Sequence, residues 1–133
     1  MIGLLYKAAD AIRARTPGYP LGRRGEDLAH RHLRANGCTV VARNFRTHEG
    51  AGEIDLVAWH GETLVFFEVK TRSSREFGEP ERAVDLEKRG RIRRAAAQYA
   101  RRADVLWEHT RFDLVSVVLD RPVQIEWIRD AFR

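Results

Sequence analysis

Two predicted strands near the middle of the chain end in charged side chains. Glu68 and Lys70 close the apolar run 63–67, and Asp55 lies at the start of the strand before it. Side chains two residues apart on a strand point to the same face, so Glu68 and Lys70 share one. Carboxylates held close together repel each other, and a divalent cation with oxygen ligands relieves that repulsion. We therefore expect Asp55 and Glu68 to bind Mg²⁺ or Mn²⁺.

Lys70 and Glu53 surround this predicted metal site. Lys70 is placed to position or deprotonate a metal-bound water, or to stabilise charge that develops on a scissile phosphate. The alternative is a solvent-exposed pair of Glu68 and Lys70, worth less than about 1 kcal/mol. Spacing alone leaves both interpretations open. Glu53 shares a face with Asp55, and we expect it to form an ion pair with an arginine at the sheet edge, behind the metal ligands.

The elements that must position these residues follow from periodicity and turn signals. Residues 1–20 read as a poorly specified arm that ends in Pro17, Gly18 and Pro20. Helical spacing of apolar residues predicts helices over 25–35 and 83–102, the second with its core face at Ile92, Ala95, Ala96, Tyr99 and Ala103. Short β-branched or aromatic runs predict strands over 38–45, 54–59, 63–70, 112–119 and 123–128. A polar turn with glycine at 59–62 favours an antiparallel hairpin between the second and third strands.

The order of elements predicts an α/β or α+β domain, with a central mixed sheet of about five strands flanked by helices. We expect one domain over 21–133, since a chain of 133 residues is long enough to bury a proper core. The single cysteine, Cys38, excludes an internal disulfide and a thiolate zinc cage. No apolar run is long enough to span a bilayer, and the start lacks the order of a secretory signal. We expect a cytoplasmic protein with no membrane partner.

The charge balance favours a nucleic-acid partner, here DNA. The chain has 24 Lys and Arg against 19 Asp and Glu, a formal net charge of +5. The predicted helix 83–102 carries seven basic residues after its first turn and presents most of them outward, where they can meet successive phosphates. A merely solvated helix face is the alternative. The side chains expected to contact phosphates are Arg23, Arg24, Arg72, Arg75, Lys88, Arg91 and Arg94.

The acid pattern resembles a known nuclease signature. Twelve residues separate Asp55 from the Glu68-Val69-Lys70 triplet, the arrangement of the PD-(D/E)xK nucleases. The chain also resembles the YraN-like family of small bacterial proteins, which have a restriction-endonuclease-like fold and are similar to archaeal Holliday-junction resolvases. The match covers roughly residues 21–119. The matching residues are Gly22, Gly25-Glu26 and Ala29, the segments 42–46, 52–55 and 67–72, Lys88, and Arg111-Phe112-Asp113.

This resemblance implies metal binding by Asp55 and Glu68, catalysis assisted by Lys70, and a contribution from Glu26. An acid in the first turn of a helix is also favoured by the helix dipole, which is the alternative for Glu26. The implied activity is Mg²⁺-dependent endonucleolytic hydrolysis of DNA, with branched or structured DNA as one substrate class. Symmetric cleavage of a junction implies a homodimer. The other hypothesis is a non-catalytic nucleic-acid-binding or assembly module that keeps the nuclease fold.

Overall fold

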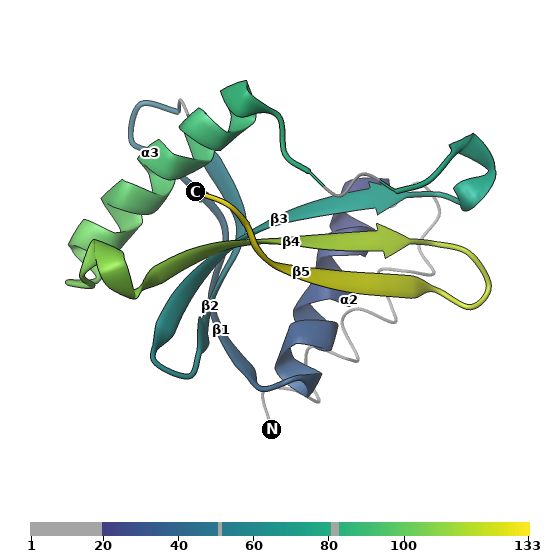
Figure 1. Ribbon diagram of the computed structural model, residues 1–133, viewed down its shortest axis with the longest axis horizontal. Coiled ribbons are helices and arrows are strands. Elements are labelled where there is room, and N and C mark those ends of the chain that lie inside the picture. The colour runs from purple at the N-terminus through teal and green to yellow at the C-terminus, as the bar shows by residue number, and fades with distance from the viewer. Residues whose placement is uncertain (1–19, 51, 81–82) are drawn as a thin grey trace.

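The computed structural model describes residues 20–50, 52–80 and 83–133 of the 133-residue chain (Figure 1). The predicted arm 1–20 therefore lies outside the described residues, apart from Pro20. Along the chain the elements are α2 (Leu21–Ala35), β1 (Cys38–Arg46), β2 (Glu53–His60), β3 (Thr63–Arg72), a short 3₁₀ turn (Arg75–Phe77), α3 (Leu86–Arg102), a second 3₁₀ turn (Trp107–His109), β4 (Thr110–Val118) and β5 (Gln124–Phe132).

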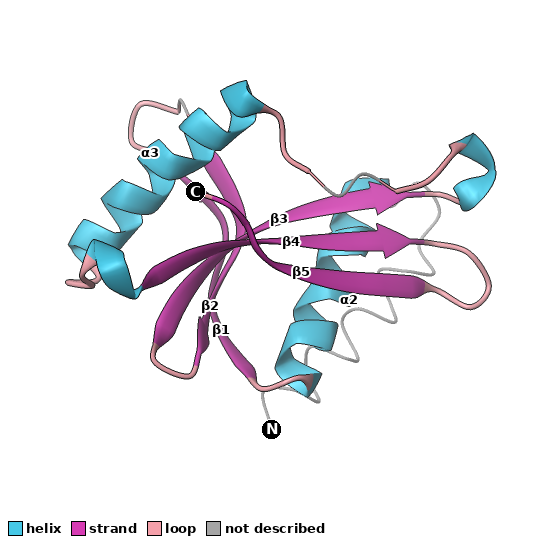
Figure 2. Ribbon diagram, viewed as in Figure 1, coloured by secondary structure: helices cyan, strands magenta, loops and turns pink. Residues whose placement is uncertain are grey.

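The five strands form one mixed sheet in the order β1-β2-β3-β4-β5 (Figure 2). All neighbours are antiparallel except β3 and β4, which run parallel. The predicted β2–β3 hairpin is confirmed, and Gly61 in its turn has a φ of 62°, which glycine adopts without strain. A parallel pair needs a crossover, and α3 supplies it between β3 and β4.

The sheet is covered on both faces, which explains the unbroken apolar run of β3. Leu64 and Phe66 lie in the core cluster that includes Ile92 of α3. Val65 and Phe67 alternate with them and lie in a second cluster, which includes Leu33 of α2. A strand buried on both faces needs apolar residues at every position. The predicted α+β sandwich is therefore confirmed, and it is the architecture of a restriction-endonuclease-like domain.

Both helices begin at residues other than those predicted. We expected the first helix to begin at Gly25, but α2 begins at Leu21, and the N–H of Arg24 already bonds to the carbonyl of Pro20. Gly25 therefore lies within the helix. A glycine is needed there because α2 lies close to β3, and a Cβ at this position would lie 1.7 Å from Oγ1 of Thr71. The second helix begins at Leu86 rather than residue 83, because the side chain of Asp85 caps its N-terminus.

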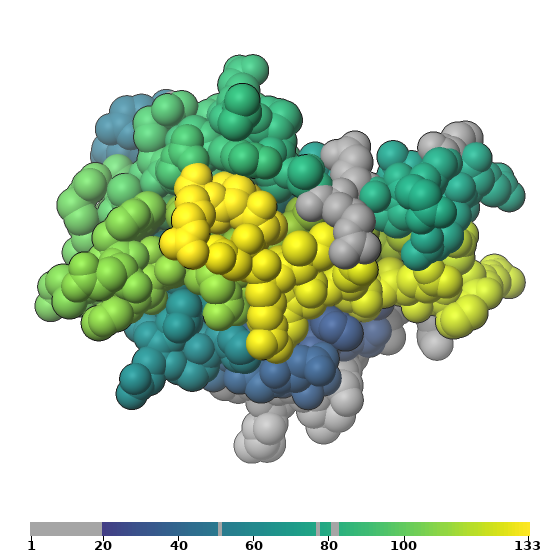
Figure 3. Space-filling model, viewed as in Figure 1, coloured from purple at the N-terminus to yellow at the C-terminus, as the bar shows by residue number. Residues whose placement is uncertain are grey.

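The C-terminal ends of α3 and β5 also differ from the prediction. Ala103, which we expected on the core face of the helix, is exposed because α3 ends at Arg102. Ala100 is buried in the core instead. β5 continues to Phe132 instead of ending at residue 128. A register shift opposite Phe112 and a positive φ of 52° at Asp130 let the strand bend and continue pairing. The last residues then pack on α3, as the yellow and green surfaces in Figure 3 show, and Arg93 donates a hydrogen bond to the carbonyl of Arg133.

Candidate active site

The site begins where β2 and β3 part. Their last paired residues are Leu56 and Phe67, and one step further Oδ2 of Asp55 accepts a hydrogen bond of 2.8 Å from the N–H of Val69. The Asp55 carboxylate thus accepts the hydrogen bond of the Val69 N–H, which the backbone of β2 does not accept because the two strands are no longer paired there. This contact fixes Asp55 beside Glu68, so the structure brings together the two carboxylates that the sequence pairs.

Glu68 is the most deeply buried acid of the site. Its side chain is 3% exposed and lies on the face of the sheet covered by α3, since it is paired in register with the core residue Leu114. Burial, and next the charge of Glu68, raise the pKa of Asp55 to about 8, although the Val69 hydrogen bond acts in the opposite direction. Two carboxylates in contact with little water are therefore the defining electrostatic feature of the site.

Lys88 lies inside the site and not on the outer surface where we expected it. Its Nζ is 2.5 Å from Oε1 of Glu68. Lysine in the first turn of a helix is disfavoured by the dipole, and the Glu68 carboxylate compensates for that cost. Burial would lower the pKa of Lys88, but its hydrogen bond to Glu68 and the charges of Glu68 and Asp55 raise it overall. Lys88 thus forms an internal ion pair, and its contact with phosphate stays a prediction.

Lys70 lies at the end of β3, two residues beyond Glu68 and on the same face of the sheet. It is half-buried and paired in register with Ser116 of β4. The backbone N–H of Lys88 chiefly lowers the pKa of Asp85, and the charge of Lys70 contributes in the same direction. Lys70 therefore faces the start of α3, and the acid-x-lysine unit of the sequence forms one edge of the site.

Glu26 approaches the same carboxylates from the other helix. Because α2 begins at Leu21, Glu26 is not in the first turn, and the dipole alternative does not apply. Burial raises its pKa, against the effects of a hydrogen bond with Asn44 and the charge of Arg43, and Glu26 in turn raises that of Asp55. Arg43 lies 3.8 Å from Glu26 and 2.8 Å from Asp27. Arg43 and Asn44 are site residues that our sequence reasoning missed, although both stand in a segment of the family match.

Glu53 forms an ion pair with Arg46, with 3.6 Å between Oε2 and Nη2. Arg46 lies on the edge strand β1 and is paired with Glu53 of β2, with side chains 72% and 40% exposed, so Glu53 forms the expected ion pair with an arginine at the sheet edge. Glu53 also lines a surface pocket of about 310 Å³ with Lys88 and Arg91. This pocket lies between β2 and the first turns of α3, and it adjoins the carboxylates through Lys88, which pairs with Glu68.

The donor set suits a cation that keeps part of its water shell. Within the described residues no three His, Cys, Asp or Glu side chains form a group that could hold a metal by themselves. Magnesium is commonly held by one or two carboxylates, with water and substrate phosphate completing its six oxygens. Asp55 and Glu68 fit this coordination, and a bound cation would offset the burial and the Glu68 charge that raise the pKa of Asp55.

The basic residues predicted to contact phosphate are not gathered on one surface. Arg91 and Arg94 are exposed on α3, whereas Arg23 and Arg24 lie in the first turn of α2 on the opposite face of the sheet. The expectation that Arg23 and Arg24 precede the helix is wrong, because α2 starts at Leu21. Arg72 donates a 3.2 Å hydrogen bond to the carbonyl of Gly78, inside the loop that follows β3. The α3 side therefore has the basic residues nearest to the carboxylates.

A second buried acid, Asp113, has a structural task. It is fully buried on β4 and accepts hydrogen bonds from Nε and Nη2 of Arg111, Nε1 of Trp127 and the backbone N–H of Asp130. These bonds hold β5 at its register shift. The sequence match includes Arg111-Phe112-Asp113, and the structure explains these residues by the anchoring of the edge strand.

A five-stranded mixed sheet between two helices, with paired carboxylates where its hairpin opens, defines an α+β domain consistent with the restriction-endonuclease-like class. The chain belongs to the family described as "Uncharacterised protein family UPF0102", the YraN-like family, whose model matches residues 25–117. In the described residues no helix is long and apolar enough to cross a membrane.

Three similar proteins illustrate the family. A UPF0102 protein of Solibacter usitatus is 64% identical, covering 99% of this chain and 100% of its own length. One of Koribacter versatilis is 48% identical, covering 84% of this chain and 78% of its own. One of Rhodococcus opacus is 43% identical, covering 84% of this chain and 95% of its own. At least 84% of the chain is therefore shared with each of these three bacterial proteins.

Proposed function

We propose that this protein is a metal-dependent endonuclease that hydrolyses phosphodiester bonds of DNA, with branched or structured DNA as a candidate substrate. The observation that carries the proposal is the contact pair Asp55 and Glu68, buried at the opening of the β2–β3 hairpin with Lys70 at its edge. Two ionised carboxylates in contact repel each other, so their convergence at this end of the sheet favours a site that binds a cation.

Each side chain of the site has a distinct task in this reaction. Asp55 and Glu68 would hold Mg²⁺ or Mn²⁺, which supplies charge stabilisation at the phosphate and lowers the pKa of its bound water. The amine of Lys70 donates hydrogen bonds to a phosphate oxygen or to the attacking water. Glu26 holds Arg43 and Asn44 near the carboxylates and adds negative charge beside Asp55.

The surface around the carboxylates suits a phosphodiester strand. The pocket beside Glu53 is lined by Lys88, the partner of Glu68, and by Arg91. Arg94 is exposed one turn further along α3. Contacts of this kind position the backbone without reading the sequence.

The test is a cleavage assay on labelled single-stranded, duplex, flap and four-way-junction DNA, with Mg²⁺, Mn²⁺ or a chelator. We expect metal-dependent product from the parent and none from Asp55→Asn or Lys70→Ala. Glu62→Gln, which changes an exposed acid in the turn of the same hairpin, is the control and should cut like the parent. Cleavage by Asp55→Asn at the parental rate would refute the mechanism.

Binding without cleavage would favour the second candidate, a nucleic-acid-binding or assembly module. Its signature is an affinity that falls with salt, with a log–log slope of about −0.9 per phosphate neutralised on duplex DNA, and no product with any metal. Light scattering of the same samples, with and without junction DNA, measures the molar mass and so the oligomeric state. A homodimer on the junction is the state expected if two strands are cut symmetrically.

A further inference from the structure

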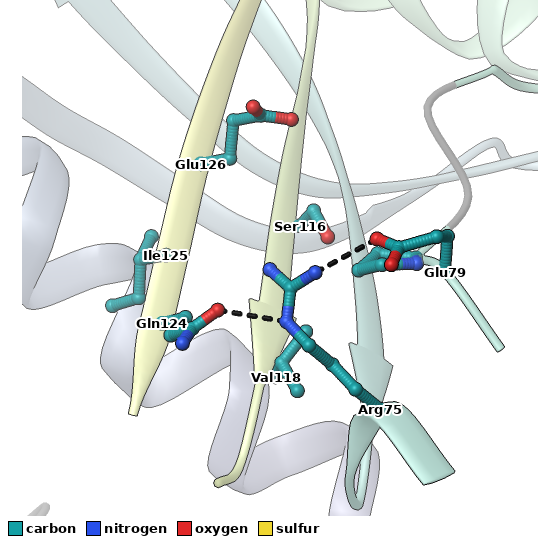
Figure 4. Close-up of a pocket in the computed structure, with 8 residues that line it drawn as sticks. Arg75, Glu79, Ser116, Val118, Gln124, Ile125 and Glu126 are labelled. Atoms are coloured by element: carbon teal, nitrogen blue, oxygen red, sulfur yellow. Dashed lines mark hydrogen bonds and ion pairs between the residues drawn. The ribbon is translucent and has the colours of Figure 1, made fainter. Parts of the chain in front are cut away.

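A second pocket, of about 410 Å³, lies over β4 and β5 beside the loop that follows β3 (Figure 4). Alternate residues of two neighbouring strands form its floor, so their side chains point to the same face of the sheet. These are Ser116 and Val118 of β4 and Gln124 and Glu126 of β5. Arg75 and Glu79, in the loop that follows β3, form the wall.

The strand register connects this pocket to the candidate active site. Lys70 of β3 is paired with Ser116 of β4, and Ser116 is paired with Glu126 of β5. Paired residues point to the same face, and neighbouring strands are about 4.8 Å apart. The pocket therefore begins one strand away from Lys70, and a group bound there would be adjacent to a phosphate held at Lys70.

The wall of the pocket is held in place by Arg75. Its Nε donates a 2.8 Å hydrogen bond to Oε1 of Gln124, and its Nη1 lies 2.8 Å from Oε2 of Glu79, as the dashed lines in Figure 4 show. Its backbone N–H also approaches Oδ2 of Asp120 at 3.4 Å. These contacts bind the loop to β5 across the sheet, so the pocket is shaped before a ligand arrives. Arg75, which we expected to contact phosphate, is instead occupied by them.

The polar groups of the pocket are mainly acceptors. Among the lining residues, Glu79 and Glu126 carry carboxylate acceptors, and the guanidinium of Arg75 donates to Glu79 and Gln124. A planar base with an amino group suits such a lining, because carboxylates accept hydrogen bonds from amino groups of bases. A volume of about 410 Å³ is within the range of ligand pockets and wide enough for a purine.

We propose that this pocket receives an unpaired nucleobase next to the scissile phosphate, and that it prefers adenine, cytosine or guanine over thymine. The inference rests on the proposed nuclease function and deepens it by specifying the substrate. A base in a duplex is stacked and paired and cannot enter a walled pocket until it leaves the helix. The substrates that follow are those with an unpaired nucleotide at the cut: single strands, flaps and open junctions.

The first experiment measures base insertion without cleavage. 2-Aminopurine, which carries an amino group, is placed at successive unpaired positions of a flap DNA and bound to Asp55→Asn. We expect its fluorescence to rise several-fold at one position, where the base leaves its stack. The rise should be lost when Glu126→Ala is added, because alanine removes the acceptor. It should persist with Glu108→Ala, which changes an exposed acid just before β4.

The second experiment measures cleavage by the parent and Glu126→Ala on DNA with adenine, thymine or an abasic residue at that position. An abasic residue should lower kcat/KM of the parent about tenfold, the size of one hydrogen-bonded contact, and thymine should fall between. Glu126→Ala should abolish the difference while it cuts the abasic DNA like the parent. Equal rates on all three DNAs would overturn the pocket inference and leave the nuclease intact.

The two proposals fail in different ways. A position-specific fluorescence rise that requires Glu126, without cleavage by the parent on any DNA, would support the pocket and refute the hydrolysis. Cleavage without any fluorescence rise would support the hydrolysis and refute the pocket. Absence of both binding and cleavage would refute both.

Discussion

The Nζ of Lys88 lies 2.5 Å from Oε1 of Glu68, and this contact joins the first turn of α3 to the end of β3. Glu68 is buried, whereas Lys88 remains 37% exposed. The lysine therefore neutralises a carboxylate that water scarcely reaches, while its own stem stays accessible from the pocket beside Glu53. A cation bound by Asp55 and Glu68 would compete with Lys88 for the same oxygen.

Lys88→Met should lower the free energy of unfolding in chelator by about 2 kcal/mol, because it leaves Glu68 buried without its cation. We expect less than the full penalty of a buried pair, since Lys88 is partly exposed. Arg91→Met, an exposed position on the same helix, should change stability by less than about 0.5 kcal/mol. Urea denaturation of both variants measures the difference. Equal midpoints would show that the ion pair does not stabilise the fold.

Asp55→Asn should make the metal-free protein more stable, by an amount that depends on pH. The unfolded chain releases this proton near its ordinary pKa of 3.8, whereas the folded protein keeps it up to a pKa of about 8. Folding therefore loses stability as pH rises between these values, and the loss is complete above the folded pKa. Asparagine removes the titration and can still accept the Val69 N–H.

Denaturation in chelator at pH 4.5, 6, 7.5 and 8.5 measures this effect. The advantage of Asp55→Asn should grow to about 2 kcal/mol at the upper end and be near zero at the lower end. Mg²⁺ at pH 7.5 should stabilise the parent and not the variant. A constant difference across the series would mean that the Asp55 carboxyl does not titrate with a raised pKa.

Gly25→Ala should destabilise the protein by about 2 kcal/mol, the usual cost of overpacking a tight contact. The added Cβ would lie 1.7 Å from Oγ1 of Thr71, so α2 must move away from the end of β3. Gly22→Ala is the matched control in the same helix, because a Cβ there meets nothing within 4 Å. It should stabilise the protein by about 0.5–1 kcal/mol through helix propensity. Thermal unfolding followed by circular dichroism compares the two, and effects of the same sign would contradict the prediction.

Asp113→Asn should cost about 3 kcal/mol or more, because one amide oxygen replaces two carboxylate oxygens that accept four hydrogen bonds. The Arg111 guanidinium would also lose its counter-charge. Trp127, which donates to Asp113, reports the change by fluorescence during denaturation. Glu108→Gln, an exposed acid just before β4, should unfold like the parent, and an Asp113→Asn midpoint equal to it would exclude an anchoring role.

The β2–β3 hairpin and the pairing of Asp55 with Glu68 could be predicted because they depend on local signals. A two-residue period fixes which side chains share a face, and Gly61 fixes the turn. The inward position of Lys88 could not be predicted in this way. A basic run on a helix suggests an outward face, and only the docking of α3 on the sheet turns its first lysine towards Glu68.

The remaining errors have the same physical origin. In the sequence, Gly25 suggests the start of a helix. The structure shows that glycine is needed within the helix because Thr71, a residue far along the chain, lies against it. β5 was predicted to end at residue 128 but continues to Phe132. The hydrogen bond from the Asp130 N–H to Asp113, seventeen residues away, holds the strand in place across its register shift. Contacts between distant segments decide these details, and periodicity contains no information about them.

The parallel pairing of β3 with β4 has a consequence for the order of folding. Hairpins close within about 1–10 μs because their strands are neighbours in sequence, whereas a parallel pair must wait for its crossover. We therefore expect the β2–β3 hairpin to bring Asp55 and Glu68 together before α3 docks and supplies the amine of Lys88. In this order of folding, the crossover helix that connects β3 to β4 also supplies the cation that neutralises Glu68.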